Sequence, residues 1–100
     1  MNNKTTLVVT AMPNPAEIES MQAYFKGVLP LLMSAGGQII KRQKVRTSLS
    51  GPPTFGMVLV MDFPSTETVE ALFASDEYAA LIPVRDRGFS SLSIALTQDL

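Results

Sequence analysis

Hydrophobic residues recur along this chain with two different periods, one typical of strands and one typical of helices. β-Branched and apolar residues dominate 5–12 and 55–63, the stretch 38–47 combines Ile39, Ile40 and Val45 with basic residues, and in 91–97 large apolar residues alternate with small ones. These four stretches therefore predict strands. The 55–63 strand is apolar on both of its faces, which predicts a central strand covered on both sides. The pattern leaves open which of those faces meets the helices.

A helix is predicted between the first two strands, because apolar side chains recur there at helical spacing. They form one stripe, made of Ile18, Met21, Phe25, Val28 and Leu32. Asn14 predicts the N-cap of this helix and Pro15 its first position. Pro30 predicts a kink or a break, since proline has no N–H to donate, and Gly36-Gly37 predicts the end of the helix.

Two further helical segments are predicted between the third and fourth strands. Ser65 and Ser75 each stand where a hydroxyl oxygen can cap a helix. The apolar side chains that the first of these segments would bury are Val69, Leu72 and Phe73. Pro83 interrupts the second segment and Gly88 ends it.

The resulting βαββαβ order predicts a fold of the α+β class. Short, right-handed connections favour the ferredoxin-like arrangement, a four-stranded antiparallel sheet with its helices on one face, within a single domain over residues 1–100. The first and third strands would be central and the second would lie at an edge. The second strand carries four basic side chains, Lys41, Arg42, Lys44 and Arg46. We interpret them as the solvated face of an edge strand, and anion binding is the alternative.

The helices of such a fold cover one face of the sheet, while the third strand brings apolar residues to the other face as well. Exposed apolar patches beyond a few hundred Å² mark interaction surfaces. We therefore expect a homodimer formed through the open face of the sheet, with a monomer as the alternative.

Composition excludes several classes of function. The chain has no cysteine and no histidine, which removes thiolate and imidazole metal ligands, haem ligation by histidine and the Ser-His-Asp triad. We expect no metal and no cofactor. Eight Lys and Arg against nine Asp and Glu give a net charge of -1, which offers no general attraction to nucleic acid or anionic membranes. A cytoplasmic protein is expected.

The RNA recognition motif shares the βαββαβ order and is a specific alternative. Its third strand carries a basic residue, a glycine and aromatic residues on which bases stack. Here Phe55 and Gly56 are present, but Met57 and Val60 stand at the other aromatic positions and the basic residue is missing. We therefore expect no RNA binding.

A series of motifs resembles one known family. The motifs are Tyr24, Pro30-Leu31-Leu32, Gly36-Gly37, Phe63-Pro64-Ser65, Ser75, Glu77-Tyr78, Leu81 and Arg85. Together they are similar to the domain of unknown function 1330 family, of the dimeric α+β barrel superfamily. The resemblance implies a homodimer whose two sheets pack together, and it brings no agreed activity. The family often has Glu-Gly where this sequence has Ser50-Gly51.

Tyr24, Tyr78 and Arg85 are the candidate ligand-binding residues. The resemblance implies a small-molecule cleft between the first helix and the sheet, near Tyr24, whose ring could otherwise lie in the core with its hydroxyl in water. Tyr78 and Arg85 are seven residues apart, which places them on one helical face if the helix continues through Pro83. Arg85 could bind a carboxylate bidentately or pair with an acid such as Asp86.

Two hypotheses for the function remain open. The first is a protein with a cleft for a small hydrophobic or carboxylate ligand. The second, implied by the resemblance, is a cofactor-independent oxygenase or isomerase acting on a small aromatic or polyketide-like substrate. In that enzyme Tyr24 would donate a hydrogen bond and Arg85 would bind an anion. Asp62 would be the general base if its pKa is raised, although a strand-end aspartate can instead cap the following turn.

Overall fold

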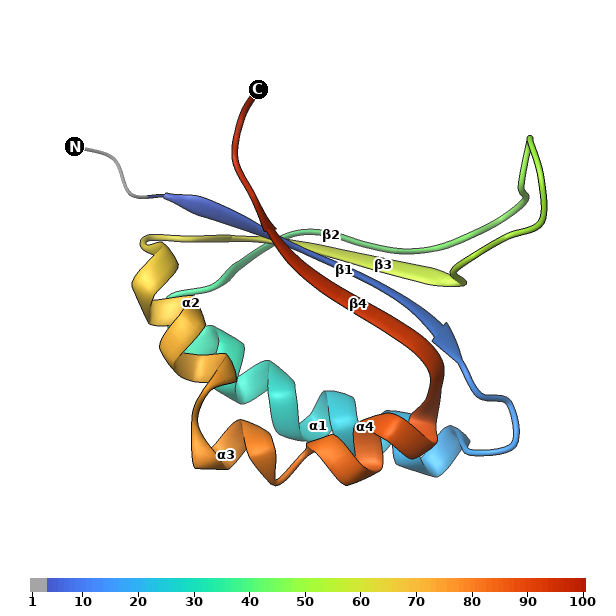
Figure 1. Cartoon of the computed structure of the whole chain (residues 1–100), viewed down its shortest axis with the longest axis horizontal. Helices are drawn as coiled ribbons and strands as arrows, with labels where there is room; N and C mark the ends of the chain where they lie inside the picture. The colour runs from blue at the N-terminus through green and yellow to red at the C-terminus, as the bar shows by residue number, and fades with distance from the viewer. Residues whose placement is uncertain (1–3) are drawn as a thin grey trace.

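The computed structural model describes residues 4–100, which form one sheet and four helices. The elements are β1 (Thr5–Pro13), α1 (Ile18–Ser34), β2 (Gln38–Lys44), β3 (Met57–Phe63), α2 (Thr66–Phe73), α3 (Asp76–Ala79), α4 (Ile82–Gly88) and β4 (Phe89–Thr97). All four helices lie on the same side of the sheet (Figure 1). The predicted ferredoxin-like order is confirmed, with the second helical region divided among α2, α3 and α4.

The strands of the sheet follow the order β2-β3-β1-β4, and every neighbouring pair is antiparallel. β1 and β3 are therefore central and β2 lies at an edge, as predicted. Leu7 of β1 is opposite Met61 of β3 on one side and Leu96 of β4 on the other. Because residues opposite each other share a face, these three side chains all point toward the helices.

This register also establishes which face of β3 meets the helices. Met61 and Phe63 are buried in the core, so the helix-facing residues of β3 are Met57, Leu59, Met61 and Phe63. Val58, Val60 and Asp62 therefore lie on the open face. The buried core between helices and sheet comprises Leu7, Ala11, Tyr24, Val28, Leu32, Met61, Phe63, Val69, Tyr78 and Phe89.

The start of α1 differs from the prediction. The helix begins at Ile18, and the Asn14 side chain instead accepts a hydrogen bond from the backbone N–H of Ala16, at 3.0 Å. The backbone N–H of Asn14 donates to the Gly88 carbonyl, at 2.9 Å, and Nδ2 donates to the Arg87 carbonyl, at 3.3 Å. Asn14 thus joins the β1–α1 connection to the end of α4 rather than capping α1.

The end of α1 agrees with the prediction, although its interior does not. The helix continues through Pro30 to Ser34, so the predicted break does not occur. Pro30 is exposed, so it lies on the solvent side of the helix. Water there can bind the carbonyl one turn earlier, which receives no N–H from the proline. Gly36 adopts a φ of 90°, and the N–H of Gly37 donates to the Leu32 carbonyl at 3.0 Å. This is the geometry that a glycine pair supplies at the end of a helix.

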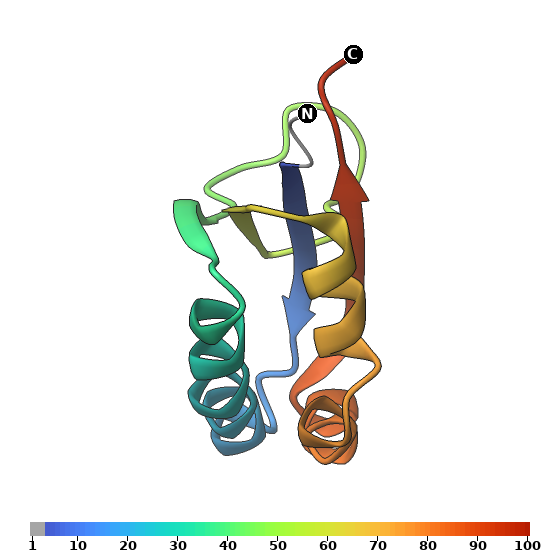
Figure 2. The ribbon, with the colours of Figure 1, turned by 90° about the vertical axis from the view of Figure 1, so that its left-hand side faces the viewer.

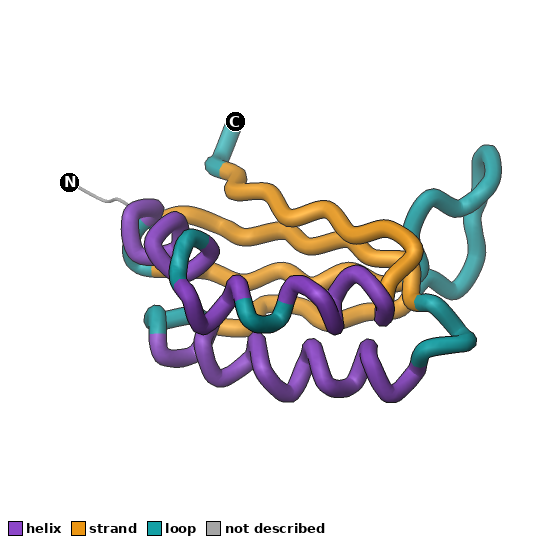
Figure 3. The backbone as a smooth tube through the Cα atoms, turned by 60° about the horizontal axis from the view of Figure 1, so that its bottom comes forward, coloured by secondary structure: helices purple, strands orange, loops and turns teal. Residues whose placement is uncertain are grey.

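Beneath the sheet the helices form two rows, with α1 in one row and α2, α3 and α4 in the other (Figures 2 and 3). Ser65 and Ser75 cap α2 and α3 as predicted, each accepting a backbone N–H at 3.2 Å. The helical path is interrupted between Ala79 and Ile82, so Tyr78 and Arg85 lie on two separate helices. At Gly88, α4 approaches α1 so closely that an added Cβ would lie 2.7 Å from the Met21 backbone nitrogen.

β2 ends at Lys44 and β3 begins at Met57, so both strands are shorter than predicted. The connection between them, residues 45–56, extends to the side of the sheet that faces away from the helices (Figure 1). The four basic side chains of this edge, Lys41, Arg42, Lys44 and Arg46, are all exposed.

Candidate functional site

The structure brings together Tyr24, Tyr78 and Arg85, the three residues proposed from the sequence. Tyr24 lies in the middle of α1, Tyr78 in α3 and Arg85 in α4. The two tyrosine hydroxyl oxygens are 2.9 Å apart, and Nη1 of Arg85 donates to the Tyr78 hydroxyl at 3.1 Å. Since Tyr24 and Tyr78 are only 4% and 3% exposed, the chain of hydrogen bonds runs from the core outward to Arg85.

Aromatic packing fixes the orientation of both tyrosines. The Tyr24 ring makes edge contacts with Tyr78 and Phe89, at centroid distances of 6.3 and 5.7 Å. Phe73 packs against Tyr78 in the same manner, at 4.7 Å. Edge-to-face pairs of this kind add to the energy of burial and restrict the rings. The hydroxyl groups are therefore held in place by their rings as well as by their hydrogen bonds.

Arg85 also contacts solvent and a carboxylate. Its side chain is 25% exposed, and Nε donates to Oδ1 of Asp86 at 3.1 Å. Pairing with Asp86 is the alternative to carboxylate binding that the sequence left open for Arg85. The guanidinium carbon lies 5.9 Å from the centroid of the Tyr78 ring. The hydrogen bond to Tyr78 is the main reason that the pKa of Arg85 is raised, so the side chain remains a cation.

Burial keeps Tyr24 protonated. Desolvation raises the pKa of its phenol, with a further increase from the hydrogen bond to Tyr78. Its hydroxyl does not reach water, in contrast to the alternative considered for this residue. Tyr24 can donate a hydrogen bond at neutral pH, but it cannot serve as a base there.

A hollow of about 380 Å³ lies beside Tyr78 and Arg85, between α2–α4 and the β1–β4 side of the sheet. The remaining side chains that line it are Leu7, Val69, Glu70, Phe73, Ile82, Ile94 and Leu96. A second hollow of about 470 Å³ adjoins it, since Arg85 and Ile94 line both. The second is more polar and includes Ser90 and Ser91. Arg85 thus lies between an apolar hollow and a more polar one.

Tyr24 lines neither of these hollows. The space between α1 and the sheet, where the resemblance implied a cleft, is a separate hollow of about 460 Å³ at the β2 edge. Phe25 and Leu29 of α1 line it, together with Arg42 and Lys44 of β2. Tyr24 instead contacts the site through the hydroxyl of Tyr78.

Asp62 lies away from this group, on the open face of the sheet. Its carboxylate accepts a hydrogen bond from the Thr6 hydroxyl at 2.7 Å and lies 3.4 Å from Nζ of Lys4. The hydrogen bond from Thr6 is the main reason that the pKa of Asp62 lies below its ordinary value. A base with a raised pKa was the condition for its catalytic role, and the geometry does not join it to Tyr24 or Arg85.

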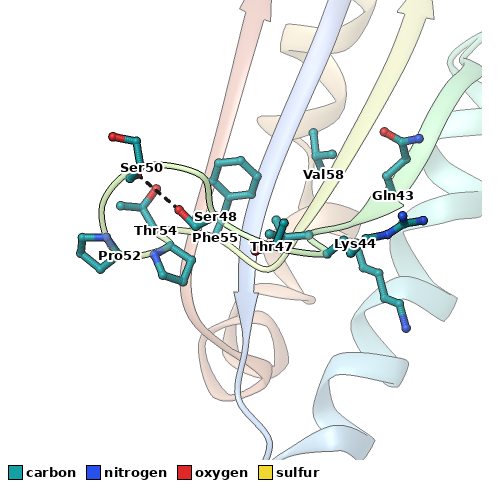
Figure 4. Close-up of a pocket in the computed structure, with 12 residues that line it drawn as sticks. Gln43, Lys44, Thr47, Ser48, Ser50, Pro52, Thr54, Phe55 and Val58 are labelled. Atoms are coloured by element: carbon teal, nitrogen blue, oxygen red, sulfur yellow. Dashed lines mark hydrogen bonds between the residues drawn. The ribbon is translucent and has the colours of Figure 1, made fainter.

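A feature that the sequence pattern missed is the shape of the 45–56 connection. It encloses an open hollow of about 550 Å³, in which the Ser48 hydroxyl donates to the Ser50 carbonyl at 3.3 Å (Figure 4). Pro52 and Thr54 line it from the far side of the loop. The side chains around the hollow are mostly polar and exposed, so water already solvates them. The stretch has neither helical nor strand periodicity, and such sequences give no signal for a loop's shape.

Within residues 4–100, no group of three or more acidic side chains is placed to hold a metal ion. Among the helices in this part of the chain, none is long and apolar enough to cross a membrane.

The fold and the strand order define an α+β protein of the ferredoxin-like class. The family model of DUF1330, a domain of unknown function, matches residues 5–98. The chain therefore belongs to this family. No curated protein matches the sequence.

Solved structures of similar fold have low sequence identity to the chain. A protein of unknown function from Rhodopseudomonas palustris is 14% identical with a TM-score of 0.83, and the alignment covers 100% of this chain and 85% of that protein's chain. A dimeric ferredoxin-like protein of unknown function from Jannaschia sp. is 7% identical with a TM-score of 0.73, covering 96% and 99%. A protein from Nitrosomonas europaea, described as a candidate antibiotic biosynthesis monooxygenase, is 10% identical with a TM-score of 0.68, covering 100% and 93%.

Proposed function

We propose that this protein binds a small molecule in the apolar hollow beside Tyr78 and Arg85. The observation that carries the proposal is a chain of hydrogen bonds from the buried Tyr24 and Tyr78 to the partly exposed Arg85, at the wall of an open hollow of about 380 Å³. Small-molecule sites are typically concave and mostly apolar, with a few fixed polar groups that orient the ligand. Hydrophobic and carboxylate ligands both fit this description.

Each polar residue has a distinct role in this proposal. Arg85 and Tyr78 line the hollow and contact the ligand, since both supply groups at its wall. Tyr24 is a positioning residue, because its hydroxyl contacts Tyr78 and does not line the hollow.

The second part of the proposal is a homodimer, formed through the open face of the sheet. The middle of that face carries small, uncharged side chains from three strands, namely Val8, Thr10, Val58, Val60, Ser93 and Ala95. Such a surface can pack against a copy of itself without burying a charge. Similar structures from Jannaschia sp. and Bacteroides fragilis are described as dimeric, which supports a second copy as the occupant.

A thermal-shift screen against a library of small metabolites tests the binding function. A ligand should raise the melting temperature of the wild type and of Arg87→Ala, but not that of Arg85→Ala. Arg87 is a matched control because it is an exposed arginine of the same helix that does not line the hollow. A ligand that stabilises all three proteins equally would bind elsewhere, and a library without any hit would count against the proposal.

A cofactor-independent oxygenase or isomerase is the second candidate. The structural similarity to the Nitrosomonas europaea protein favours it. The adjacent hydrogen-bond donors of Tyr78 and Arg85, which are placed to stabilise a developing oxyanion, favour it as well. Asp62 is not its base in this proposal, because its carboxylate lies on the open face of the sheet. The enzyme hypothesis requires that a ligand from the screen be converted under air by the wild type. Tyr78→Phe should then reduce kcat more than it changes KM.

A further inference from the structure

We infer that the ligand is a monocarboxylic acid with a compact apolar body, whose carboxylate is held by Tyr78 and Arg85 together. This inference rests on the proposed binding function and specifies the chemistry of the same hollow. It follows from three features of the site: the direction of its hydrogen bonds, the donors of Arg85 and the lining of the cavity.

The direction of the tyrosine hydrogen bond follows from counting donors and acceptors. A tyrosine hydroxyl has one proton to donate and two lone pairs that accept. Among residues 4–100, Tyr78 is the hydrogen-bond partner that the structure gives Tyr24. If Tyr78 donated to Tyr24, the proton of Tyr24 would be buried without an acceptor, at a cost of about 1–3 kcal/mol. If Tyr24 donates, the proton left over is that of Tyr78, which lines the hollow, where water or a ligand can accept it. We therefore assign Tyr24 as the donor.

Tyr78 is left with a proton to offer. It accepts one hydrogen bond from Tyr24 and a second from Nη1 of Arg85, which together occupy both lone pairs of its oxygen. Its O–H must then find a different acceptor. Because Tyr78 lines the apolar hollow, a ligand oxygen in that hollow can accept this proton.

Arg85 supplies the second donor and the positive charge. A guanidinium has five N–H groups, and the bonds to Tyr78 and Asp86 engage Nη1 and Nε. Asp86 is 63% exposed, so its ion pair with Arg85 is screened by water and of the weak surface type. A carboxylate that enters the hollow meets a cation and a hydroxyl donor side by side, which is the pairing that such a group prefers.

The lining of the hollow determines the rest of the ligand. Leu7, Val69, Phe73 and Ile82 offer it no polar group, so the body of the ligand has to be apolar. The volume of about 380 Å³ is at the small end of the usual range for ligand sites. Glu70 also lines the hollow, and its charge disfavours a second carboxylate on the ligand.

Titration calorimetry with benzoate and with benzyl alcohol as probes tests this inference. The two share one ring and differ in the carboxylate. Benzoate should bind the wild type more tightly, and Arg85→Met and Tyr78→Phe should each weaken benzoate binding about ten- to a hundredfold, as expected for hydrogen bonds to a charged group. Arg87→Met should bind benzoate like the wild type. Amide NMR shifts should localise the bound benzoate to α3, α4 and β4.

The outcomes separate this inference from the proposed function. If both probes bind equally and Arg85→Met has no effect, the inference that the ligand carries a carboxylate is overturned. The proposal of a small-molecule site in the hollow would still stand. If benzoate fails to bind, the hits of the library screen decide: a monocarboxylate that depends on Arg85 supports the inference, and neutral or cationic hits overturn it. A library without hits removes the proposed function as well. Far-UV circular dichroism establishes that each variant is folded.

Discussion

Tyr24 and Tyr78 share a hydrogen bond in the core, and removing it should have a measurable cost. Tyr24→Phe deletes one bond at 2.9 Å, which predicts a loss of about 1 kcal/mol in the free energy of unfolding. Tyr78→Phe should cost more, because it leaves both Tyr24 and Arg85 without their acceptor. Urea denaturation of both single variants and the double variant measures the coupling. Strictly additive effects would show that the two hydroxyls do not interact.

The raised pKa of Tyr24 predicts how stability depends on alkaline pH. The folded protein keeps this proton, while the unfolded chain releases it near the ordinary value of 10.0. The folded state therefore binds more protons above that pH, and its stability should decline as the pH rises further. Below that value Tyr24 contributes no pH dependence. Urea midpoints measured from pH 8 to pH 11 should decline less in Tyr24→Phe, and an unchanged slope would contradict the assignment.

Sequence reasoning named the polar residues of the candidate site but not the way they contact each other. A spacing of seven residues, two helical turns, predicts that Tyr78 and Arg85 share a helical face. The helix is in fact interrupted between them, and they form their hydrogen bond across two separate helices, α3 and α4. The bond between Tyr24 and Tyr78 joins residues 54 positions apart. No local pattern reports such a contact, because it depends on how α1 packs beside α3. The apolar lining of the hollow was missed for the same reason.

At the level of elements, the packing of α4 on α1 depends on a glycine. A Cβ at Gly88 would lie 2.7 Å from the Met21 nitrogen and 2.8 Å from its Cα, and backbone atoms of a helix cannot move aside. Gly88→Ala should therefore destabilise the protein by about 1–3 kcal/mol, as overpacking does. Thermal and urea unfolding measure this cost.

Gly27→Ala is the matched control on the facing helix. There the nearest atom to an added Cβ, at 2.5 Å, is the end of the flexible Leu81 side chain, which can rotate away. Alanine also favours a helix by about 1 kcal/mol relative to glycine. Gly27→Ala should therefore cost clearly less than Gly88→Ala. The reverse order would mean that the two helices are not in backbone contact at Gly88.

The elements themselves were largely predictable, since their patterns are local. The β-branched and apolar stretches of β1 and β3, the serine caps of α2 and α3, and the edge position of the basic β2 strand all agree with the structure. The start of α1 was not predictable, because Asn14 has a suitable cap side chain but its backbone and amide are bound to the end of α4. A tertiary contact here overrides a local signal.

At the level of the whole molecule, the open face of the sheet should hold two copies together. Val60→Asp places a charge in the middle of this face, on a central strand, and burying an unpaired charge is strongly unfavourable. The variant should be a folded monomer in sedimentation experiments at concentrations where the wild type is a dimer. Val60→Thr, of nearly the same shape, should dissociate much less.

Ile18→Asp is the control for Val60→Asp, since Ile18 is also a β-branched aliphatic residue but lies exposed on α1. It should leave the dimer intact. If Val60→Asp remains dimeric, the two copies do not meet through the sheet. A wild type that stays monomeric at high micromolar concentration would contradict the homodimer altogether.

The 45–56 connection extends beyond the same open face, and Leu49 in it is 96% exposed (Figure 1). In a sheet-to-sheet dimer this loop would reach the second copy, where the Leu49 side chain could be buried. Burying a leucine contributes about 1.5–3 kcal/mol, and a symmetric dimer buries two, so Leu49→Ser should weaken the dimer about a hundredfold to ten-thousandfold. Equilibrium sedimentation measures the change, with Ile18→Ser as the control for a lost exposed side chain. Stability of the separated chain should not change, because Leu49 is not packed against its own sheet. An unchanged dissociation constant would mean that the loop does not touch the partner, whichever result Val60→Asp gives for the face.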